Sequence, residues 1–395
     1  MTAKKRAVQQ YKKQFQNDSY RLFSAPGRIE IGGNHTDHQN GNILAAAIDL
    51  EIAGAAALSK TDMITVASEG YPLFQLSIHE TMPVANETET SVSFVRGILA
   101  GIAALGYTPV GLNIGIASDV LPGSGLSSSA AFSLLIATIM NAFFATGEIT
   151  PMVLAQICKT AENDYFGKPS GLMDQAVSAL GGIVQIDFAE PEAPQVKTLA
   201  YDFSENGYCI YVVNTGSSHA NLTSAYAAIP HEMGEIACYF GVPTLHTLTD
   251  ELLFAHASRL RERFGDRALL RAHHFFTETK RPAAMAAALR KDDLPQFLSL
   301  VCASGASSFQ YLQNIYPEND VRQQSLAVAL ARAESLLKGA GAWRVHGGGF
   351  AGTILCFVSH EKEALFIKGM TELFGAQCLA KLNIRSYGAR EERIS

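Results

Sequence analysis

The sequence predicts an α+β protein with strands and helices in both halves of the chain. Segments with the composition of buried strands and segments of helical periodicity are mixed, without the regular alternation of a doubly wound sheet. With 395 residues, 48% of them hydrophobic, the chain is also long enough to bury more than one core. We therefore expect an N-terminal domain over residues 1–205 and a C-terminal domain over residues 206–395.

The first half combines apolar runs typical of strands with segments of helical character. Strands are expected over residues 43–58, 63–67, 111–117 and 182–188. Helices are expected over residues 92–105, from the spacing of the apolar side chains, and over the long apolar run 130–145. Thr150-Pro151 has the N-cap and first-turn pairing of a further helix, and the turn at residues 167–171 opens a short one.

The second half is richer in helices. They are expected over residues 218–240, 284–289, 295–312, 321–338 and 361–373, with strands over residues 208–214, 343–358 and 380–387. The helix over residues 321–338 has the clearest limits, because Asp320 stands at its N-cap, Gln323 follows in capping-box spacing and Gly339 follows its end. The strand over residues 343–358 is expected to be interrupted by glycines.

The composition favours a protein that acts on small molecules. A formal net charge of −6 gives no broad attraction for nucleic acid or anionic lipid, and the longest apolar run is shorter than the ~20 residues of a membrane-spanning helix. A basic cluster between Lys4 and Lys13 precedes no apolar signal core, so we expect a solvated N-terminal helix and a cytoplasmic protein. Six cysteines without Cys-x-x-Cys spacing predict buried free thiols.

The glycine-flanked stretch from Ala25 to Asn42 is predicted to be a binding loop, because its mixture of residues is untypical of a core strand or an amphipathic helix. Its polar side chains are Arg28, Glu30, Asn34, His35, Asp37 and His38. Glycines allow positive φ angles and a close approach to a ligand, while these side chains offer donors and acceptors in both directions. A metal cluster of His35, Asp37 and His38 is an alternative, although no distant motif completes the ligand shell.

A second glycine-rich stretch, residues 123–129, lies between an expected strand and the long apolar helix. Its backbone amides and hydroxyls would crowd a helix N-terminus, which favours a bound phosphate. It lacks the lysine of a Walker loop and the last glycine of the dinucleotide fingerprint, so a different phosphate cradle and a serine-rich helix cap both remain. A third glycine cluster, residues 345–352, borders another expected strand.

Together the three stretches resemble the motifs of the galactokinase family within the GHMP small-molecule kinases. Residues 27–38 resemble the signature G-R-x-N-x-I-G-E-H-T-D-Y, residues 121–130 the phosphate motif P-x-G-x-G-L-S-S-S-A, and residues 347–352 the motif G-G-G-F-G-G. The motifs occur in the family's order and span most of the chain. The resemblance implies the two-lobed GHMP kinase fold, with a ribosomal S5-like N-terminal domain and a ferredoxin-like C-terminal domain.

The resemblance implies ATP-dependent phosphorylation of the anomeric hydroxyl of galactose, with Mg²⁺. By position, Asp174 is similar to the family's catalytic carboxylate and Arg28 to the arginine paired with it. A carboxylate can accept the proton of the attacking oxygen, and a guanidinium keeps it ionised and offsets phosphoryl charge. A loose transition state needs little early base help, so Asp174 is either a true base or mainly an electrostatic and positioning group. A helix-start cap for Asp174 and a surface ion pair for Arg28 are the structural alternatives.

Further site residues follow from the same resemblance. The implied sugar contacts are Asn34, His35, Asp37, Gly171 and Tyr226. The implied magnesium ligands are Ser129 and Glu162, with Ser128 as an alternative hydroxyl. The implied nucleotide-binding residues are Gly123, Ser124, Gly125, Leu126, Ser127, Ser128 and Phe94.

The chain departs from the family's pattern mainly in the first motif. Asn34 stands where the signature has glutamate, His38 where it has tyrosine, and Glu30 where it has asparagine. Asparagine can donate as well as accept and carries no charge, so a kinase for a different hexose or a uronic acid is an alternative. Ser91 stands at an aromatic position beside the adenine pocket, which leaves room for a nucleotide other than ATP.

A catalytically silent sensor of galactose and ATP is the alternative from another functional class. The presence of Arg28, Asp174 and Glu162 speaks against it. No stretch has the character of an unambiguous interface, and a monomer is favoured.

Overall fold

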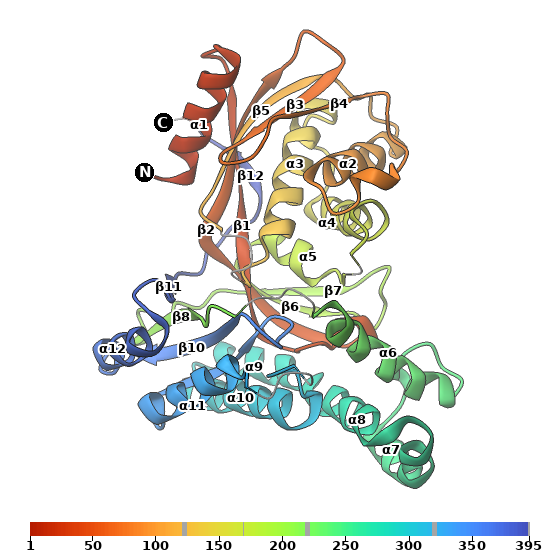
Figure 1. Ribbon diagram of the computed structural model, residues 1–395, viewed down its shortest axis with the longest axis vertical. Coiled ribbons are helices and arrows are strands. Elements are labelled where there is room, and N and C mark those ends of the chain that lie inside the picture. The colour runs from red at the N-terminus through yellow and green to blue at the C-terminus, as the bar shows by residue number, and fades with distance from the viewer. Residues whose placement is uncertain (121–124, 169, 218–221, 318–321, 394–395) are drawn as a thin grey trace.

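The computed structural model describes residues 1–120, 125–168, 170–217, 222–317 and 322–393. Two lobes, each built on a β-sheet, follow one another along the long axis of the molecule (Figure 1). Most of the first half of the chain forms the upper lobe in this view, and most of the second half forms the lower lobe. Strands and helices are mixed in both lobes, so the predicted α+β class is confirmed.

The upper lobe contains a sheet of eight strands among the described residues. Its main path is β12-β1-β2-β5-β3-β4, while β6 pairs with β2 and with β7. The strands are β1 (Arg21–Gly32), β2 (Asn42–Leu58), β3 (Met63–Ser68), β4 (Phe74–Ser77), β5 (Leu112–Ser118), β6 (Ile183–Asp187), β7 (Gln195–Leu199) and β12 (Arg390–Glu392). Neighbouring strands run antiparallel, except that β3 and β5 are parallel.

Helices cover both faces of this sheet (Figure 1). One face carries α2 (Ser91–Ala104), α3 (Ser128–Phe144), α4 (Pro151–Thr160) and α5 (Met173–Leu180), and the other carries α1 (Ala3–Phe15). Glycines in the strands allow the helices to lie close. A Cβ on Gly54 would stand 3.1 Å from Ile139 of α3, and one on Gly115 would stand 2.5 Å from the backbone of Tyr11 in α1.

The lower lobe contains a four-stranded antiparallel sheet in the order β11-β8-β10-β9 among the described residues. The strands are β8 (Tyr208–Asn214), β9 (Gly341–His346), β10 (Thr353–Ser359) and β11 (Leu379–Leu382). Side chains alternate between its faces. Those of Cys209, Tyr211 and Val213 pack with α11 (Ser325–Leu337) and α12 (Glu363–Phe374), whereas Ile210 and Val212 join the core that includes α9 (Arg281–Arg290) and α10 (Leu294–Ser307). A further helical layer consists of α6 (Thr223–Tyr239), α7 (Asp250–Ala255) and α8 (Ala257–Glu278).

The prediction of a binding loop over residues 25–42 is wrong for its first part, which is a strand. Residues up to Gly32 belong to β1, and every residue from Phe23 to Gly32 is buried. The polar residues Arg28 and Glu30 made this strand difficult to predict from the sequence. Both can be buried because each is paired with an opposite charge, Arg28 with Asp174 and Glu30 with Arg344.

Other predicted elements differ in extent. The segment 343–358 is two antiparallel strands, β9 and β10, and the segment 380–387 is strand only up to Leu382. Thr150-Pro151 does begin α4, which continues as a π-helix over Ala161–Phe166. The helix expected from residue 321 begins at Ser325, and its predicted N-cap Asp320 lies outside the described residues. The 22-residue helix α8 was missed, because its many charges and the kink at Gly265 conceal its apolar face.

The end of the chain returns to the upper lobe, where β12 pairs with β1. The domain boundary at residues 205 and 206 stays a prediction. All six cysteines are free: Cys158, Cys209, Cys356 and Cys378 are buried as predicted, Cys302 is partly buried, and Cys238 is exposed against expectation. Within the described ranges, no helix has the length and apolar character needed to cross a membrane.

Candidate active site

Three glycine-rich motifs that are far apart in the sequence meet between the lobes. The backbone N–H of Arg28 donates to the carbonyl of Leu126 over 3.1 Å, which joins the first motif to the second. The side chain of Asn34 donates to the carbonyl of Gly347 over 2.8 Å, which joins the first motif to the third. A Cβ on Gly125 would stand 2.4 Å from Oγ1 of Thr353 in β10, and the φ of Gly125 is +73°, so glycine is required there.

Arg28 and Asp174 form a two-pronged ion pair at this meeting point. Nε and Nη2 of Arg28 donate to the two carboxylate oxygens of Asp174, each over 2.7 Å, and Nη1 donates to the carbonyl of Gly125 over 2.7 Å. Arg28 comes from the end of β1 and Asp174 from the first turn of α5. Since the guanidinium is 8% exposed and the carboxylate 28% exposed, the pair is not a surface ion pair. Planar bidentate pairing of this kind holds both groups in one orientation.

The Asp174 carboxylate is kept ionised. Burial by itself would raise its pKa, but Arg28 and the hydroxyl of Ser127 outweigh burial and lower the pKa below its usual value. Ser127 donates to Oδ2 of Asp174 over 2.6 Å. The pairing leaves Asp174 as a charged acceptor at neutral pH, and the alternative of a helix-start cap is excluded because the N-cap residue of α5 is Leu172.

The phosphate motif leads into the N-terminus of α3. Ser127 has a φ of +59° and precedes the helix, which begins at Ser128. The first N–H groups of a 17-residue helix point at this place, so it suits an anion. Two of the predicted nucleotide-binding residues, Gly123 and Ser124, lie outside the described residues.

The two predicted magnesium ligands lie next to each other. Oγ of Ser129 donates to Oε1 of Glu162 over 3.2 Å. Glu162 is 2% exposed, and Ser170 and Gln175 also donate to it, both to Oε2, over 3.1 and 2.5 Å. The ammonium group of Lys168, whose side chain is 62% exposed, lies 3.5 Å from Oε1. A hydroxyl and a held carboxylate beside a helix N-terminus fit a Mg²⁺ that retains several waters.

On the sugar side, Asp37 lies against Gly171. A Cβ at position 171 would stand 1.8 Å from Oδ2 of Asp37, so any other residue there would displace the Asp37 carboxylate. Burial raises the pKa of Asp37 to about 6, and the nearby charges of Asp174 and Glu30 add to this effect. The two predicted sugar contacts are therefore adjacent, and one of them titrates close to neutrality.

Two imidazoles complete this side. Nε2 of His35 lies 3.1 Å from the carbonyl of Gly348, and the rings of His35 and His38 meet edge to face with centroids 5.7 Å apart. Burial lowers the pKa of His35 to about 4 and that of His38 to about 3, so both rings are neutral at physiological pH. Both ring nitrogens of His38 are covered and have no hydrogen-bond partner among the described residues.

Within the described residues, no group of three or more His, Cys, Asp or Glu side chains is arranged to hold a metal ion. The alternative of a metal cluster at His35, Asp37 and His38 therefore gains no support.

Asn34, the third predicted sugar contact on this loop, is fully buried. Its amide donates to Oε1 of Glu30 over 3.0 Å as well as to Gly347, and Glu30 in turn accepts from Nη2 of Arg344 over 2.7 Å. Burial raises the pKa of Glu30, while Arg344 and Arg28 oppose that rise. Asn34 thus lies among protein groups on all sides in this structure.

Two predicted aromatic residues lie at the edges of the site. The hydroxyl of Tyr226 in α6 donates to the carbonyl of Gly349 over 2.7 Å, and burial raises the pKa of this tyrosine to about 12. Phe94 in α2 is 4% exposed and stacks on Phe166 with ring centroids 4.5 Å apart. It also meets Phe132 of α3, so it supports the helix that follows the phosphate motif.

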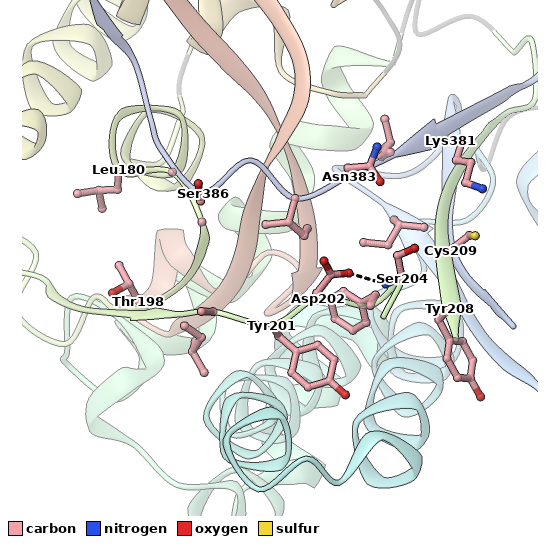
Figure 2. A pocket seen from close by; sticks show the side chains of 18 residues that line it. Leu180, Thr198, Tyr201, Asp202, Ser204, Tyr208, Cys209, Lys381, Asn383 and Ser386 are labelled. Atoms are coloured by element: carbon pink, nitrogen blue, oxygen red, sulfur yellow. Dashed lines mark hydrogen bonds between the residues drawn. The ribbon is translucent and has the colours of Figure 1, made fainter. Parts of the chain in front are cut away.

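A cavity of about 870 Å³ lies elsewhere, between β7, β8 and the segment that leads from β11 back to the upper lobe (Figure 2). None of its lining residues belongs to the three motifs. Its charged groups are occupied, since Lys381 pairs with Glu363 over 2.7 Å and Asp202 accepts from the N–H of Ser204 over 2.8 Å. The candidate active site is therefore not this cavity but the region around Arg28 and Asp174, where the three motifs meet.

Several site residues were missed from the sequence. Lys168 and Gln175 hold Glu162, and Arg344 lies fully buried against Glu30. His346 of β9 accepts from the backbone N–H of Glu30 over 3.2 Å. A signal existed for Lys168 and Gln175, which flank the turn before Asp174, whereas nothing in the sequence relates Arg344 to position 30.

Comparison with known proteins agrees with the geometry of the site. Residues 93–182 match the model of the GHMP kinases N terminal domain, and residues 9–58 match the galactokinase galactose-binding signature. The fold is similar to that of a mevalonate kinase from Methanococcus jannaschii, with a TM-score of 0.65 at 16% identity over 93% of this chain and 99% of that one. In this part of its sequence and in its fold, the chain is similar to the GHMP kinases.

Among these kinases, galactokinases are similar to the chain over nearly its whole length. It is 29% identical to a galactokinase of Glaesserella parasuis over 93% of both chains, and 26% identical to one of Streptomyces coelicolor over 90% of this chain and 89% of the relative. The structure of Lactococcus lactis galactokinase complexed with galactose superimposes with a TM-score of 0.83 at 22% identity, over 98% of both chains. The predicted GHMP kinase fold is thereby confirmed.

Proposed function

We propose that the protein transfers the γ-phosphoryl group of ATP to the anomeric hydroxyl of galactose, which gives galactose 1-phosphate and ADP. The observation that carries the proposal is the bidentate Arg28–Asp174 pair at the place where the three motifs meet. The galactokinase relatives support galactose as the sugar, and the Lactococcus lactis structure holds galactose.

Asp174 orients the anomeric hydroxyl and accepts its proton as the oxygen attacks phosphorus. The carboxylate is ionised before the substrate arrives, since Arg28 and Ser127 lower its pKa. Arg28 keeps Asp174 in place and puts a positive charge beside the phosphoryl group that is being transferred. The sugar contacts in this proposal are His35, Asp37, Gly171 and Tyr226.

The nucleotide phosphates are proposed to lie at the N-terminus of α3, over Gly125, Leu126, Ser127 and Ser128, with Phe94 beneath the helix. Ser129 and Glu162 would hold a Mg²⁺ ion, which neutralises charge on the phosphates when it is bound. Ser170 and Gln175 keep the Glu162 carboxylate in position for this task. We also propose that the protein is cytoplasmic, since ATP is its co-substrate, and that it is a monomer, as expected from the sequence.

The test is an ADP-release assay with ATP and a panel of galactose, N-acetylgalactosamine and galacturonate, with the product identified by phosphorus NMR. We expect turnover with galactose to exceed turnover with the other two sugars. Preference for another sugar would keep the reaction type and replace the substrate. ADP release with none of them, together with measurable galactose binding, would replace the proposal by a sensor.

Asp174→Asn supplies the matching inactive protein. The amide keeps the shape of the side chain but can neither accept the proton nor balance Arg28, so kcat should fall about 10³- to 10⁴-fold. Circular dichroism and the melting temperature show whether the variant is folded. Turnover within tenfold of the unmodified protein would remove Asp174 from the catalytic role.

A further inference from the structure

All polar groups of Asn34 are engaged by the protein. The amide nitrogen of the side chain donates to Glu30 and Gly347, and the side-chain oxygen accepts from Ser308 over 3.1 Å and from Asn314 over 2.9 Å. The backbone N–H donates to Glu278 over 3.4 Å, and the backbone carbonyl accepts from Nε2 of His274 over 2.9 Å. A primary amide has two donor hydrogens and an oxygen with two acceptor positions, so none remains for a ligand.

Apart from Glu30, these partners come from the other lobe. Asn34 follows β1 of the upper lobe, whereas His274 and Glu278 belong to α8, Ser308 to the π-helix Ser308–Leu312 that follows α10, and Gly347 to the glycine turn after β9. The orientation of the amide is settled by chemistry, because the carbonyl of Gly347 can only accept a hydrogen bond. One side chain therefore ties the sugar loop to separate parts of the lower lobe.

The acid and the amide of the family's signature have exchanged positions in this chain. The signature has asparagine at position 30 and glutamate at position 34, whereas this chain has Glu30 and Asn34, hydrogen-bonded to each other. The exchange places the carboxylate against Arg344, which is 0% exposed and also donates to the carbonyl of Ile31 over 2.7 Å. The amide is left at the position that precedes His35.

The next residue needs such support. His35 has a φ of +56°, a left-handed conformation that is unfavourable for a residue with a side chain. Strained residues of this kind persist where their surroundings hold them. The hydrogen bonds of Asn34 and the contact of His35 with the carbonyl of Gly348 stabilise this conformation.

We propose that Asn34 does not contact the sugar but is a positioning residue, which clamps the His35 turn to the lower lobe through Glu30, Gly347, Ser308 and Asn314. In this clamp Glu30 is the carboxylate that the exchange has moved out of the sugar site. The selection of the sugar then rests on His35, Asp37 and the residues around them. The inference rests on the proposed function and deepens it.

The first experiment compares Asn34→Asp with Asn141→Asp. Asn141 is a matched control, because it is also buried and its amide joins two segments through both atoms of the Ile149 backbone, over 3.0 and 3.1 Å. Each substitution turns a donor into a carboxylate oxygen without a change of size. Both variants should melt about 5 °C or more below the unmodified protein.

Activity separates the two variants at a temperature well below both transitions. Asn34→Asp should lower kcat/KM for galactose about tenfold or more, together with its lower melting temperature, because His35 is displaced. Asn141→Asp should leave kcat/KM unchanged. A change in the ratio between sugars with an unchanged melting temperature would show that Asn34 faces the substrate. A lower melting temperature with unchanged kcat/KM would show that it does not position the loop. Either result overturns the proposal.

The second experiment tests the exchange itself with Asn34→Glu, Glu30→Asn and the double variant. Asn34→Glu restores the signature residue but brings a carboxylate next to Glu30 and Glu278, and Glu30→Asn leaves the buried Arg344 without its partner. Each single variant should melt lower, and the double variant should recover at least half of the loss of Asn34→Glu. If the two losses of melting temperature simply add in the double variant, the proposed exchange of roles between positions 30 and 34 is wrong. Because melting needs no substrate, these measurements remain decisive even if the unmodified protein phosphorylates none of the sugars.

Discussion

The two sides of the active site differ in how they use charge. On the phosphoryl side, Arg28, Asp174, Ser129 and Glu162 have direct partners inside the site, and Arg28 and Ser129 match residues of the family's motifs. On the sugar side, the stretch from Glu30 to His38 departs from the signature at positions 30, 32, 34 and 38. The residues proposed to carry the reaction therefore have their partners within the site, while Asn34 and His35 of the proposed sugar side depend on contacts with the other lobe.

This difference has a physical reason. The transfer of a phosphoryl group needs a fixed carboxylate, a cation and a phosphate cradle whatever the acceptor is. The acceptor sugar can be bound by many combinations of donors and acceptors, as long as no buried polar group loses its partner. Substitutions on the phosphoryl side should thus affect all sugars equally, whereas those on the sugar side should separate one sugar from another.

Among the following substitutions, Arg28→Lys should cause the largest loss of kcat/KM. Lysine keeps the charge but loses the planar fork that donates to both oxygens of Asp174, so kcat/KM should fall about 100-fold, equally for every sugar. Initial rates with each member of the sugar panel measure it. Arg21→Lys is the matched control, because Arg21 also grips both oxygens of a carboxylate, that of Glu391, over 2.7 and 2.5 Å, but far from the site. An equal loss in both variants would make the Arg28 pair a purely structural feature.

Lys168→Met should have a smaller effect, confined to the nucleotide. Lys168 lies 3.5 Å from Glu162, and its charge also lowers the pKa of Asp174. Because its side chain is largely exposed, we expect only about a tenfold loss of kcat/KM for ATP and no change of KM for the sugar. Lys60→Met, at an exposed position in the turn between β2 and β3, is the control. A change in the KM for the sugar instead would show that Lys168 acts on the sugar side of the site.

The sequence predicts the phosphoryl side better than the sugar side. Arg28, Asp174, Ser129 and Glu162 were named from the resemblance to the family, and the structure brings each next to its expected neighbour. Contacts within a motif, or between motifs in a fixed order, leave a local pattern in the sequence. The same is true of the turn before α5 and of the start of α4.

The contacts of Asn34 with the other lobe could not be predicted, because these partners are spread over residues 274–347. A single sequence does not show that Glu30 lies against Arg344, and the resulting burial of charge made β1 look like a loop. The long helix α8 was missed for a similar reason. Its buried polar residues Arg271, His274 and Glu278 have partners that only the fold provides.

Asp37 should give the sugar side a pH dependence that the phosphoryl side lacks. Its pKa is raised to about 6, so lowering the pH from 7 to 5 protonates it and removes an acceptor for a sugar hydroxyl. The kcat/KM for the sugar should fall about tenfold over this range, while Asp174 stays ionised because its pKa is lowered.

The residual activity of Asp37→Asn should lack this dependence, whereas His35→Gln should retain it, because the pKa of His35 is only about 4. Initial rates from pH 5 to 8 measure both. A profile that His35→Gln flattens would assign the titration to the imidazole instead.

His38→Tyr should have the smallest effect and is the most specific test of the sugar side. The imidazole meets the ring of His35 edge to face, and its two nitrogens have no partner among the described residues, so its shape matters more than its hydrogen bonds. Tyrosine, the signature residue, should shift the His35 ring and change the KM for the sugar about threefold, with the KM for ATP unchanged. Steady-state kinetics with each substrate varied in turn would show this. An equal change in both KM values would mean that position 38 acts through the relation between the lobes, and the two sides of the site would then not be independent.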